Sequence, residues 1–392
     1  MNKETLAFIN DNKHKNVNDI ALLLSKKENL DANFIINQIN GWQKAKNKLP
    51  TFYNTPEIIF PSVKSMEQCS SEKTALLKNK MVSGNSLVDL TGGFGIDTYF
   101  FSKHFKTVHY VEPNKELLQI AQHNFNLLGA NIKLHHLTSE AFLNLNKNKF
   151  DVVYIDPDRR DENKRVFNLN DCSPNVIELI PLIFKIADKL LIKASPFLDI
   201  KQSLEELKTV SKCYVVAVKN DCKELLYLVE KDVTKPTEII SYNLDKNEDV
   251  FKLTYEEEQE TTSYFSQPKK YLYEPNAAIM KAGAFKAIGN RFKLDKLAQH
   301  THLYTSEVLI SDFPGRIFEV SHVTDYQKKA IQQLGIKKAN ISSRNFPEAV
   351  AMIKKKLKLK DGGDCYLFAA TNLDNKPILI VTKKMNRPTC WE

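Results

Sequence analysis

The sequence predicts an α/β protein built on a doubly wound, mostly parallel sheet, with a helical region before it and a small α+β module after it. Three observations support this fold class. Between residues 61 and 232, short apolar segments alternate with amphipathic ones, as parallel strands joined by helices require. The first apolar segment runs into a glycine-rich turn. Three of the segments end in a carboxylate, at the edge where open α/β sheets bind ligands.

The composition fits a globular protein of more than one domain. The chain has 392 residues, of which 42% are hydrophobic and 26% charged. No apolar run approaches the ~20 residues that span a bilayer, and the first 30 residues contain no signal-peptide core, so we expect a cytoplasmic protein with no membrane partner. Six scattered cysteines lack metal-ligand spacing, so we expect free thiols and no metal.

The charge balance favours an anionic partner. Lysine and arginine number 56 against 47 aspartates and glutamates, a formal net charge of +9. Such an excess attracts nucleic acid through steering and counterion release. The alternative is a lysine-rich proteome that uses lysine as its default surface residue. The charge alone therefore favours nucleic acid only weakly.

Residues 1–60 are predicted to form a helical N-terminal domain. Apolar residues recur at helical spacing as far as residue 50. Pro50 and Pro56 then interrupt the pattern, because proline cannot continue a helix.

Residues 61–232 are predicted to form the sheet domain, with a helix at 115–128 that stops at Gly129. The last two strands are joined by Lys219–Lys223, which is too short for a helical crossover. These strands must pair as a hairpin, so the seventh strand is antiparallel. The seven predicted strands lie near 87–90, 108–111, 132–135, 152–155, 190–193, 214–218 and 225–229.

The rest of the chain is predicted to contain two further parts. Residues 233–320 form an α+β (ferredoxin-like) middle region with a helix at 277–288. Residues 321–392 repeat a strand and helix alternation, with strands near 337–341, 366–370 and 378–382 and a helix at 347–357. The end of that helix is basic, with lysines at 354, 355, 356, 358 and 360.

The turn after the first strand reads Asp89-x-Thr91-x-Gly93-x-Gly95-x-Asp97. Glycines let a backbone pass close under a ligand, and the N-terminus of the following helix supplies free N–H groups. The spacing is not the GxGxxG of dinucleotide enzymes. The alternative is a tight strand-to-helix turn, capped by Asp97, that binds no ligand.

Two more strands end in acidic residues. Glu112 follows the second strand, where a carboxylate is placed to hold ribose hydroxyls. A glutamate before a proline could instead cap the next helix. The fourth strand ends in Asp156-Pro157-Asp158-Arg159-Arg160, and the alternative there is a salt-bridged loop.

These motifs give residues 65–200 a resemblance to a known family. The Asp-Leu-Thr-Gly-Gly-x-Gly-x-Asp turn, together with the Asp-Pro-x-Arg-Arg sequence, resembles bacterial class I S-adenosylmethionine-dependent methyltransferases with a C-terminal THUMP-like domain. The tail after about residue 320 is similar to that THUMP-like module. A reversed seventh strand is also typical of class I methyltransferases and is missing from nicotinamide-binding Rossmann domains. The resemblance implies a Rossmann-like class I methyltransferase sheet and S-adenosylmethionine as cofactor.

The resemblance also implies a set of cofactor-binding residues. Asp89 receives the ammonium group, Thr91, Gly93 and Gly95 form the floor under the amino-acid half, and Glu112 holds the ribose. At the third strand the family often has an aspartate that contacts the adenine amine, and here Thr138, Ser139 or a backbone group must replace it. The full predicted set is Asp89, Thr91, Gly93, Gly95, Asp97, Glu112, Thr138 and Asp156.

The predicted catalytic residues are Asp156, Pro157 and Arg159. In methyltransferases that act on exocyclic amines, the Asp side chain and the next carbonyl accept the amine protons, and an aromatic residue stacks on the base. Here Arg159 and Arg160 stand in that region and are predicted to bind the substrate, by stacking or by holding a phosphate. Methylation of pyrimidine carbon 5 is disfavoured, because Cys172 is preceded by Asp171 where those enzymes usually have proline.

The sequence thus predicts an S-adenosylmethionine-dependent methyltransferase that modifies RNA, either tRNA or rRNA, at an exocyclic amine such as guanine N2. The turn is similar to that of small-subunit rRNA guanine-N2 methyltransferases, and residues 321–392 would be an RNA-binding module. Two alternatives remain. The chain could be a small-molecule methyltransferase, or a non-catalytic RNA-binding protein on a methyltransferase fold.

Overall fold

The computed structural model describes residues 3–25, 27, 29–159, 168–245 and 248–385. The chain divides into two compact units. The first contains Met1–Ser211 and Leu226–Thr234, and the second contains Lys212–Leu225 and Lys235–Glu392.

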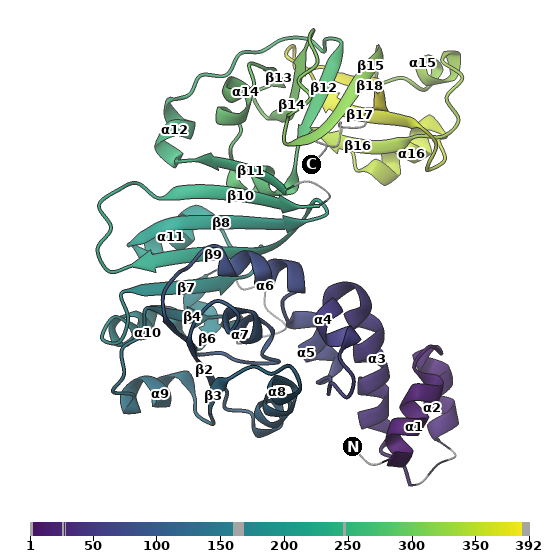
Figure 1. Cartoon of the computed structure of the whole chain (residues 1–392). Coiled ribbons are helices and arrows are strands. Elements are labelled where there is room, and N and C mark those ends of the chain that lie inside the picture. The colour runs from purple at the N-terminus through teal and green to yellow at the C-terminus, as the bar shows by residue number, and fades with distance from the viewer. Residues whose placement is uncertain (1–2, 26, 28, 160–167, 246–247, 386–392) are drawn as a thin grey trace. The chain divides into compact units, whose positions relative to one another are not determined.

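The chain begins with helices, as predicted (Figure 1). Asp31 caps the longest of them by accepting a hydrogen bond from the Phe34 N–H at 3.0 Å. That helix ends at Lys48, and Pro50 starts the next one at its first position, where proline is tolerated. The six helices are α1 (Lys3–Asn12), α2 (Val17–Leu24), α3 (Ala32–Lys48), α4 (Pro50–Asn54), α5 (Val63–Gln68) and α6 (Glu72–Asn79).

A sheet of nine strands follows, in the order β11-β10-β8-β9-β7-β4-β1-β2-β3 (Figure 1). Strands β3, β2, β1, β4 and β7 pair in parallel, with their buried side chains forming the core. The strands are β1 (Ser86–Asp89), β2 (Thr107–Val111), β3 (Ile132–His135), β4 (Val152–Ile155), β7 (Lys189–Ala194), β8 (Val210–Val218), β9 (Asp221–Glu230), β10 (Glu238–Leu244) and β11 (Glu248–Leu253).

The predicted hairpin at the seventh strand is confirmed. Strands β8 and β9 are neighbours in the sheet, and only Lys219 and Asn220 separate them. Both residues have positive φ, 52° and 62°, the combination of a tight hairpin turn. The sheet also continues further than predicted, because β10 pairs in parallel with β8 and β11 pairs with β10.

Helices follow most of the parallel strands. The predicted helix at 115–128 is α8, which ends at Leu127, with Gly129 at φ 63°. A small two-stranded sheet of β5 (Asp158–Arg159) and β6 (Cys172–Ser173) was not predicted. The other helices here are α7 (Ile96–Phe101), α9 (Ser139–Leu145), the 3₁₀ turn η1 (Leu169–Asp171), α10 (Val176–Ile183) and α11 (Ile200–Leu207).

The second unit contains a separate seven-stranded sheet, in the order β13-β14-β12-β15-β18-β17-β16. Its buried faces form two apolar clusters, around Leu272 and Phe318 and around Ile353 and Leu379. The strands are β12 (Tyr271–Pro275), β13 (Asp295–Ala298), β14 (Thr301–Ser306), β15 (Gly315–Asp325), β16 (Asn340–Arg344), β17 (Cys365–Thr371) and β18 (Pro377–Lys384).

Short helices accompany this sheet, and one prediction about them was wrong. The helix expected at 277–288 is two helices, because Gly283 adopts the left-handed conformation at φ 75° and ends the first one. The helices are α12 (Tyr255–Glu260), α13 (Ala277–Ala282), α14 (Ala287–Arg291), α15 (Lys328–Gln333) and α16 (Val350–Leu357).

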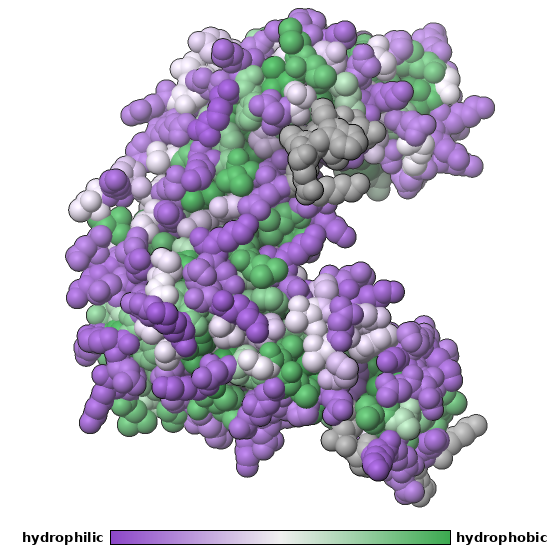
Figure 2. All heavy atoms as spheres, in the orientation of Figure 1, coloured by the Kyte–Doolittle hydropathy of each residue, from purple (hydrophilic) through white to green (hydrophobic). Residues whose placement is uncertain are grey.

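Among the described residues, every helix is too short or too polar to cross a bilayer. Hydrophilic side chains cover most of the molecular face drawn in Figure 2, with small apolar patches between them.

Candidate active site

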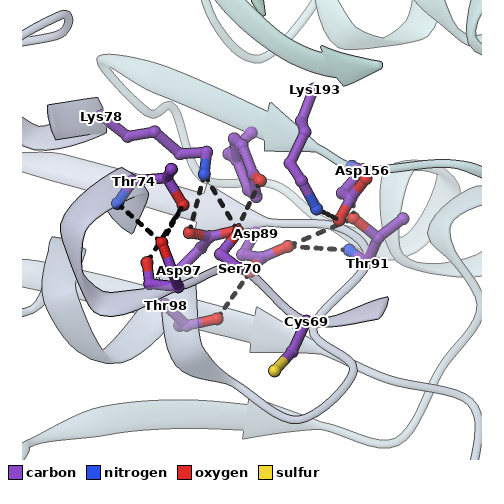
Figure 3. A network of polar contacts seen from close by, with 12 residues as sticks. Cys69, Ser70, Thr74, Lys78, Asp89, Thr91, Asp97, Thr98, Asp156 and Lys193 are labelled. Carbon is purple, nitrogen blue, oxygen red and sulfur yellow. Dashed lines mark hydrogen bonds and ion pairs between the residues drawn. The ribbon is translucent and has the colours of Figure 1, made fainter. Parts of the chain in front are cut away.

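The predicted acids of the first and fourth strands come together at one edge of the sheet (Figure 3). Strand β1 pairs in parallel with β4, and β4 with β7, so their carboxyl ends lie side by side. The backbone N–H of Asp156 donates a hydrogen bond to Thr91 Oγ1 at 2.7 Å. The turn after β1 and the end of β4 are therefore joined directly.

Asp89, at the end of β1, is only 1% exposed. Its Oδ1 accepts a hydrogen bond from the Thr91 N–H at 2.9 Å, and its Oδ2 accepts one from Thr98 Oγ1 at 2.5 Å. Burial raises the pKa of this carboxyl to about 7, in spite of those hydrogen bonds. A cation placed beside this carboxyl would favour its ionised form.

The glycines of the turn have different roles. Gly93 and Gly95 both have positive φ, 55° and 83°. A Cβ on Gly95 would lie 2.6 Å from the Phe125 ring, so the packing of the turn against α8 requires glycine there. A Cβ on Gly93 would meet nothing nearer than the Thr91 oxygen, at 3.8 Å. Gly93 is thus the glycine that borders open space, where a ligand could lie.

Glu112, at the end of β2, is buried and holds this turn in place. Its Oε2 accepts a hydrogen bond from the Gly93 N–H at 2.8 Å, and its Oε1 accepts one from the Asn114 N–H at 2.7 Å. The N-cap of α8 is Asn114, so Glu112 does not have the capping role considered as an alternative. Each of its oxygens has a second lone pair that could accept a ribose hydroxyl.

Asp97, in the first turn of α7, contacts protein groups (Figure 3). It accepts hydrogen bonds from Ser70 Oγ and from the Tyr154 hydroxyl, both at 2.7 Å, and forms an ion pair with buried Lys78 at 3.1 Å. Burial alone would raise the pKa of Asp97, but the charges of Lys78 and Lys193 and these hydrogen bonds lower it. Asp97 therefore anchors α7 to β4 and to α6.

Asp156 forms an ion pair with Lys193, which stands near the end of β7. The Asp156 side chain is 33% exposed and the Lys193 side chain 12%. Lys193 was not among the predicted site residues. The sequence feature that could have identified it is its position directly after the apolar strand segment Leu190-Leu-Ile.

Three more of the predicted site residues are Arg159, Arg160 and Thr138. The Arg159 backbone pairs with Cys172, whereas its side chain, and all of Arg160, lie outside the described residues. Thr138 is exposed and caps α9 by accepting a hydrogen bond from the Ala141 N–H at 3.2 Å. Its neighbour Ser139 is buried and donates to the Leu90 carbonyl oxygen at 2.7 Å. Within the described ranges, no cluster of three or more His, Cys, Asp or Glu side chains could hold a metal ion.

The strand order β3-β2-β1-β4-β7-β9-β8, the reversed seventh strand and the position of the glycine turn are those of the class I methyltransferase fold. The chain belongs to the family of the "putative methyltransferase from Porphyromonas gingivalis W83". The protein in that crystal structure shares 32% sequence identity with this chain. The two structures match with a TM-score of 0.86, over 98% of this chain and 99% of that one.

Two family matches describe the second unit. Residues 271–314 match a ferredoxin-like domain, and residues 315–384 match a family described as THUMP domain-like. The predicted THUMP-like C-terminal domain is confirmed.

Other comparisons are much weaker. A search of curated proteins found no match. An rRNA methylase from Streptococcus thermophilus is 17% identical, with a TM-score of 0.31, over 41% of this chain and 96% of its own. A Streptococcus mutans protein, described as a putative methyltransferase and solved in complex with SAH, is 13% identical, with a TM-score of 0.30, over 39% of this chain and 95% of its own. Similarities this low do not bear on function.

Proposed function

We propose that this chain is an S-adenosylmethionine-dependent methyltransferase that modifies tRNA or rRNA at an exocyclic base amine such as guanine N2. The observation that supports it most is the hydrogen bond between Thr91 and Asp156, because it joins a ligand-binding turn to a carboxylate suited to an amine. One side of the site would hold the cofactor and the other the acceptor.

The residues present fit the cofactor. The buried carboxylate of Asp89 suits the ammonium of its methionine part, and Glu112 can accept hydroxyls from its ribose. The open space over Gly93 leaves room for it, since a side chain there would project into that space. When bound, S-adenosylmethionine supplies an electrophilic methyl group. Thr91, Gly95 and Asp97 then shape the turn, and Thr138 remains the proposed neighbour of the adenine.

On the acceptor side, Asp156 would accept a hydrogen bond from an N–H of the base, with the Pro157 carbonyl as the second acceptor. The nitrogen lone pair is thereby oriented, and a strong base is unnecessary because the amine proton becomes acidic only once the nitrogen is alkylated. Such catalysis depends mostly on positioning. Arg159 and Arg160 would hold the nucleotide by stacking on the base or by binding a phosphate.

RNA is the proposed substrate because of the second unit. The THUMP domain-like match covers residues 315–384, and helix α16 has three lysines in its last turn. In the same region the nearby charge of Lys358 lowers the pKa of Lys328. Like charges held this close would be stabilised by phosphates.

The direct test is nucleoside mass spectrometry of tRNA and rRNA from a strain that lacks this protein. The proposal predicts the loss of one methylated nucleoside, such as N2-methylguanosine, and its return when the gene is restored. Unchanged RNA would favour a small-molecule methyltransferase if the purified protein still consumes S-adenosylmethionine. Unchanged RNA with no consumption of cofactor would favour the non-catalytic alternative.

A further inference from the structure

We propose that Lys193 is a positioning residue of this site: its ammonium group holds one oxygen of the Asp156 carboxylate and leaves the other for the acceptor nitrogen. The inference rests on the proposed function, because it takes Asp156 as the residue that contacts the acceptor. Lys193 acts through Asp156 and need not touch the substrate itself.

The two residues are brought together by strand pairing. In the parallel pair β4–β7, Ile155 is the partner of Ile192, so Asp156, which directly follows β4, lies opposite Lys193, the next residue of β7. Side chains at matching positions of neighbouring strands project to the same face of the sheet. Two buried strands therefore fix the ion pair more firmly than mobile loops could.

Asp156 is restrained at two points. Its backbone N–H is bound by Thr91 Oγ1, and its Oδ2 is bound by the Lys193 ammonium (Figure 3). Among the described residues, none donates a hydrogen bond to its other oxygen, Oδ1. A carboxylate with one oxygen engaged keeps a defined orientation, and its second oxygen remains available to an N–H donor.

The positive charge of Lys193 also acts on two other ionisable side chains, Lys48 and Asp97. On the side of the N-terminal helices, burial lowers the pKa of Lys48, and the positive charge of Lys193 lowers it further. Lys48 is bound by the Met66 and Glu67 carbonyl oxygens at 2.7 and 2.9 Å. Asp97 already has Lys78 as its close partner. The Lys193 ammonium forms its ion pair with Asp156, and at Asp97 its charge adds to that of Lys78.

A purely structural role for this ion pair is the competing explanation. Partly exposed ion pairs contribute little to stability, and the apolar residues of β4 and β7 already hold the two strands together. A second competing explanation is that Lys193 binds an RNA phosphate directly. Positioning of Asp156, a purely structural ion pair and phosphate binding predict different results for a variant in which residue 193 has no charge.

The test compares Lys193→Met, which keeps the length of the side chain but removes its charge, with Lys193→Arg, which keeps the charge. Lys147→Met removes an exposed lysine after α9 and serves as the control. Single-turnover methylation of RNA from the deletion strain, RNA affinity by fluorescence anisotropy and cofactor affinity by calorimetry are measured for each protein.

The expected result is a loss of about 10²-fold in the single-turnover rate for Lys193→Met, as for other lost positioning contacts. RNA and cofactor affinities should stay within about twofold, and Lys193→Arg should recover most of the rate. A wild-type rate in Lys193→Met would overturn the inference. So would a loss of RNA affinity without a change in rate, since that result identifies a phosphate-binding lysine.

Crystal structures of the wild type and of Lys193→Met give a readout that needs no activity. The inference predicts that the Asp156 carboxylate rotates or becomes disordered in the variant, and an unmoved carboxylate contradicts it. If the wild type methylates no RNA, the proposed function fails, whereas the position of the carboxylate still decides the role of Lys193.

Discussion

Thr91 Oγ1 accepts a hydrogen bond from the backbone N–H of Asp156 at 2.7 Å, across the pairing of strands β1 and β4. The Thr91 N–H in turn donates to Asp89 at 2.9 Å. One threonine thus connects the carboxylate proposed to bind the cofactor with the one proposed to bind the acceptor. The two halves of the proposed site therefore lie at the same edge of the sheet and are joined by hydrogen bonds.

Replacing Thr91 with valine should slow methyl transfer. Valine has nearly the same shape but cannot accept the Asp156 N–H, and an unpaired buried donor costs about 1–3 kcal/mol, or roughly 5- to 150-fold in rate. Thr91→Ser keeps the hydroxyl and should stay near the wild-type rate. A single-turnover assay of both variants checks this, and equal rates for valine and threonine would show that the hydrogen bond is unimportant.

Gly93→Val should abolish cofactor binding, because the new side chain would fill the open space over the turn. Gly129→Val is the matched control, since Gly129 also has positive φ and open surroundings but follows α8. Both variants suffer the same kind of backbone strain. Calorimetry with S-adenosylmethionine should separate them, and equal binding by Gly93→Val and the wild type would show that the turn is not the cofactor site.

Cofactor affinity should increase as the pH rises through about 7. Burial raises the pKa of Asp89 to about 7, so at lower pH the carboxyl is neutral and attracts an ammonium group poorly. The affinity should pass through a maximum between about pH 7 and 8, because the α-ammonium of the cofactor itself loses its proton at higher pH. Calorimetry from pH 5.5 to 8.5 measures this, and Asp89→Asn should bind weakly at every pH. A flat profile in the wild type would contradict the assignment of Asp89.

The same residue should make the free protein less stable at alkaline pH. The pKa of Asp89 is raised in the folded state, so its contribution is fully present below about pH 4 and is lost as the pH rises through about 7. A difference of one pKa unit corresponds to about 1.4 kcal/mol. The rise from 3.8 to about 7 therefore corresponds to a loss of about 4 kcal/mol in the free energy of unfolding at alkaline pH. Asp89→Asn should therefore unfold at higher denaturant concentration than the wild type at pH 8 but not at pH 4. Identical pH dependence in the two proteins would show that Asp89 is not the titrating group.

RNA binding should weaken steeply with salt, because each phosphate contact releases counterions. Replacing the exposed Lys355 and Lys358 with glutamate should lower the affinity for RNA by about tenfold or more at low salt and flatten the salt dependence. Lys147→Glu changes an exposed lysine of the sheet unit and should have little effect. Charge variants are preferable to deleting residues 321–392, because β15 runs from Gly315 to Asp325 and a cut at 321 would break it. An affinity independent of salt would exclude the proposed role of the THUMP-like domain.

The positions of the main candidate-site residues could be predicted from the sequence because these residues lie at the ends of strands. Asp89, Glu112 and Asp156 each follow a short apolar segment, and parallel strands place such ends at a common edge. The hairpin of β8 and β9 followed from the length of its loop. These features depend on local sequence and on the rule that the carboxyl ends of parallel strands meet at one edge of the sheet.

The features that could not be predicted depend on pairing between distant segments. Lys193 becomes relevant only because Ile192 lies opposite Ile155 in the sheet. The contacts of Asp97 with Lys78 and Tyr154 join segments far apart in the chain. The addition of β10 beside β8 likewise depends on the exposed edge of β8, which no local pattern reveals.

The central claim is that Asp156 holds the acceptor nitrogen, and Asp156→Ala tests it most directly. The measurement is single-turnover transfer of labelled methyl groups from S-adenosylmethionine to RNA of the deletion strain, with cofactor affinity measured in parallel. We predict a loss of about 10²–10³ in rate with nearly unchanged cofactor affinity, since the proposal assigns this carboxylate to the acceptor and not to the cofactor. Arg159→Ala should instead weaken RNA binding more than it slows transfer. An Asp156→Ala protein that methylates RNA at the wild-type rate would contradict the account.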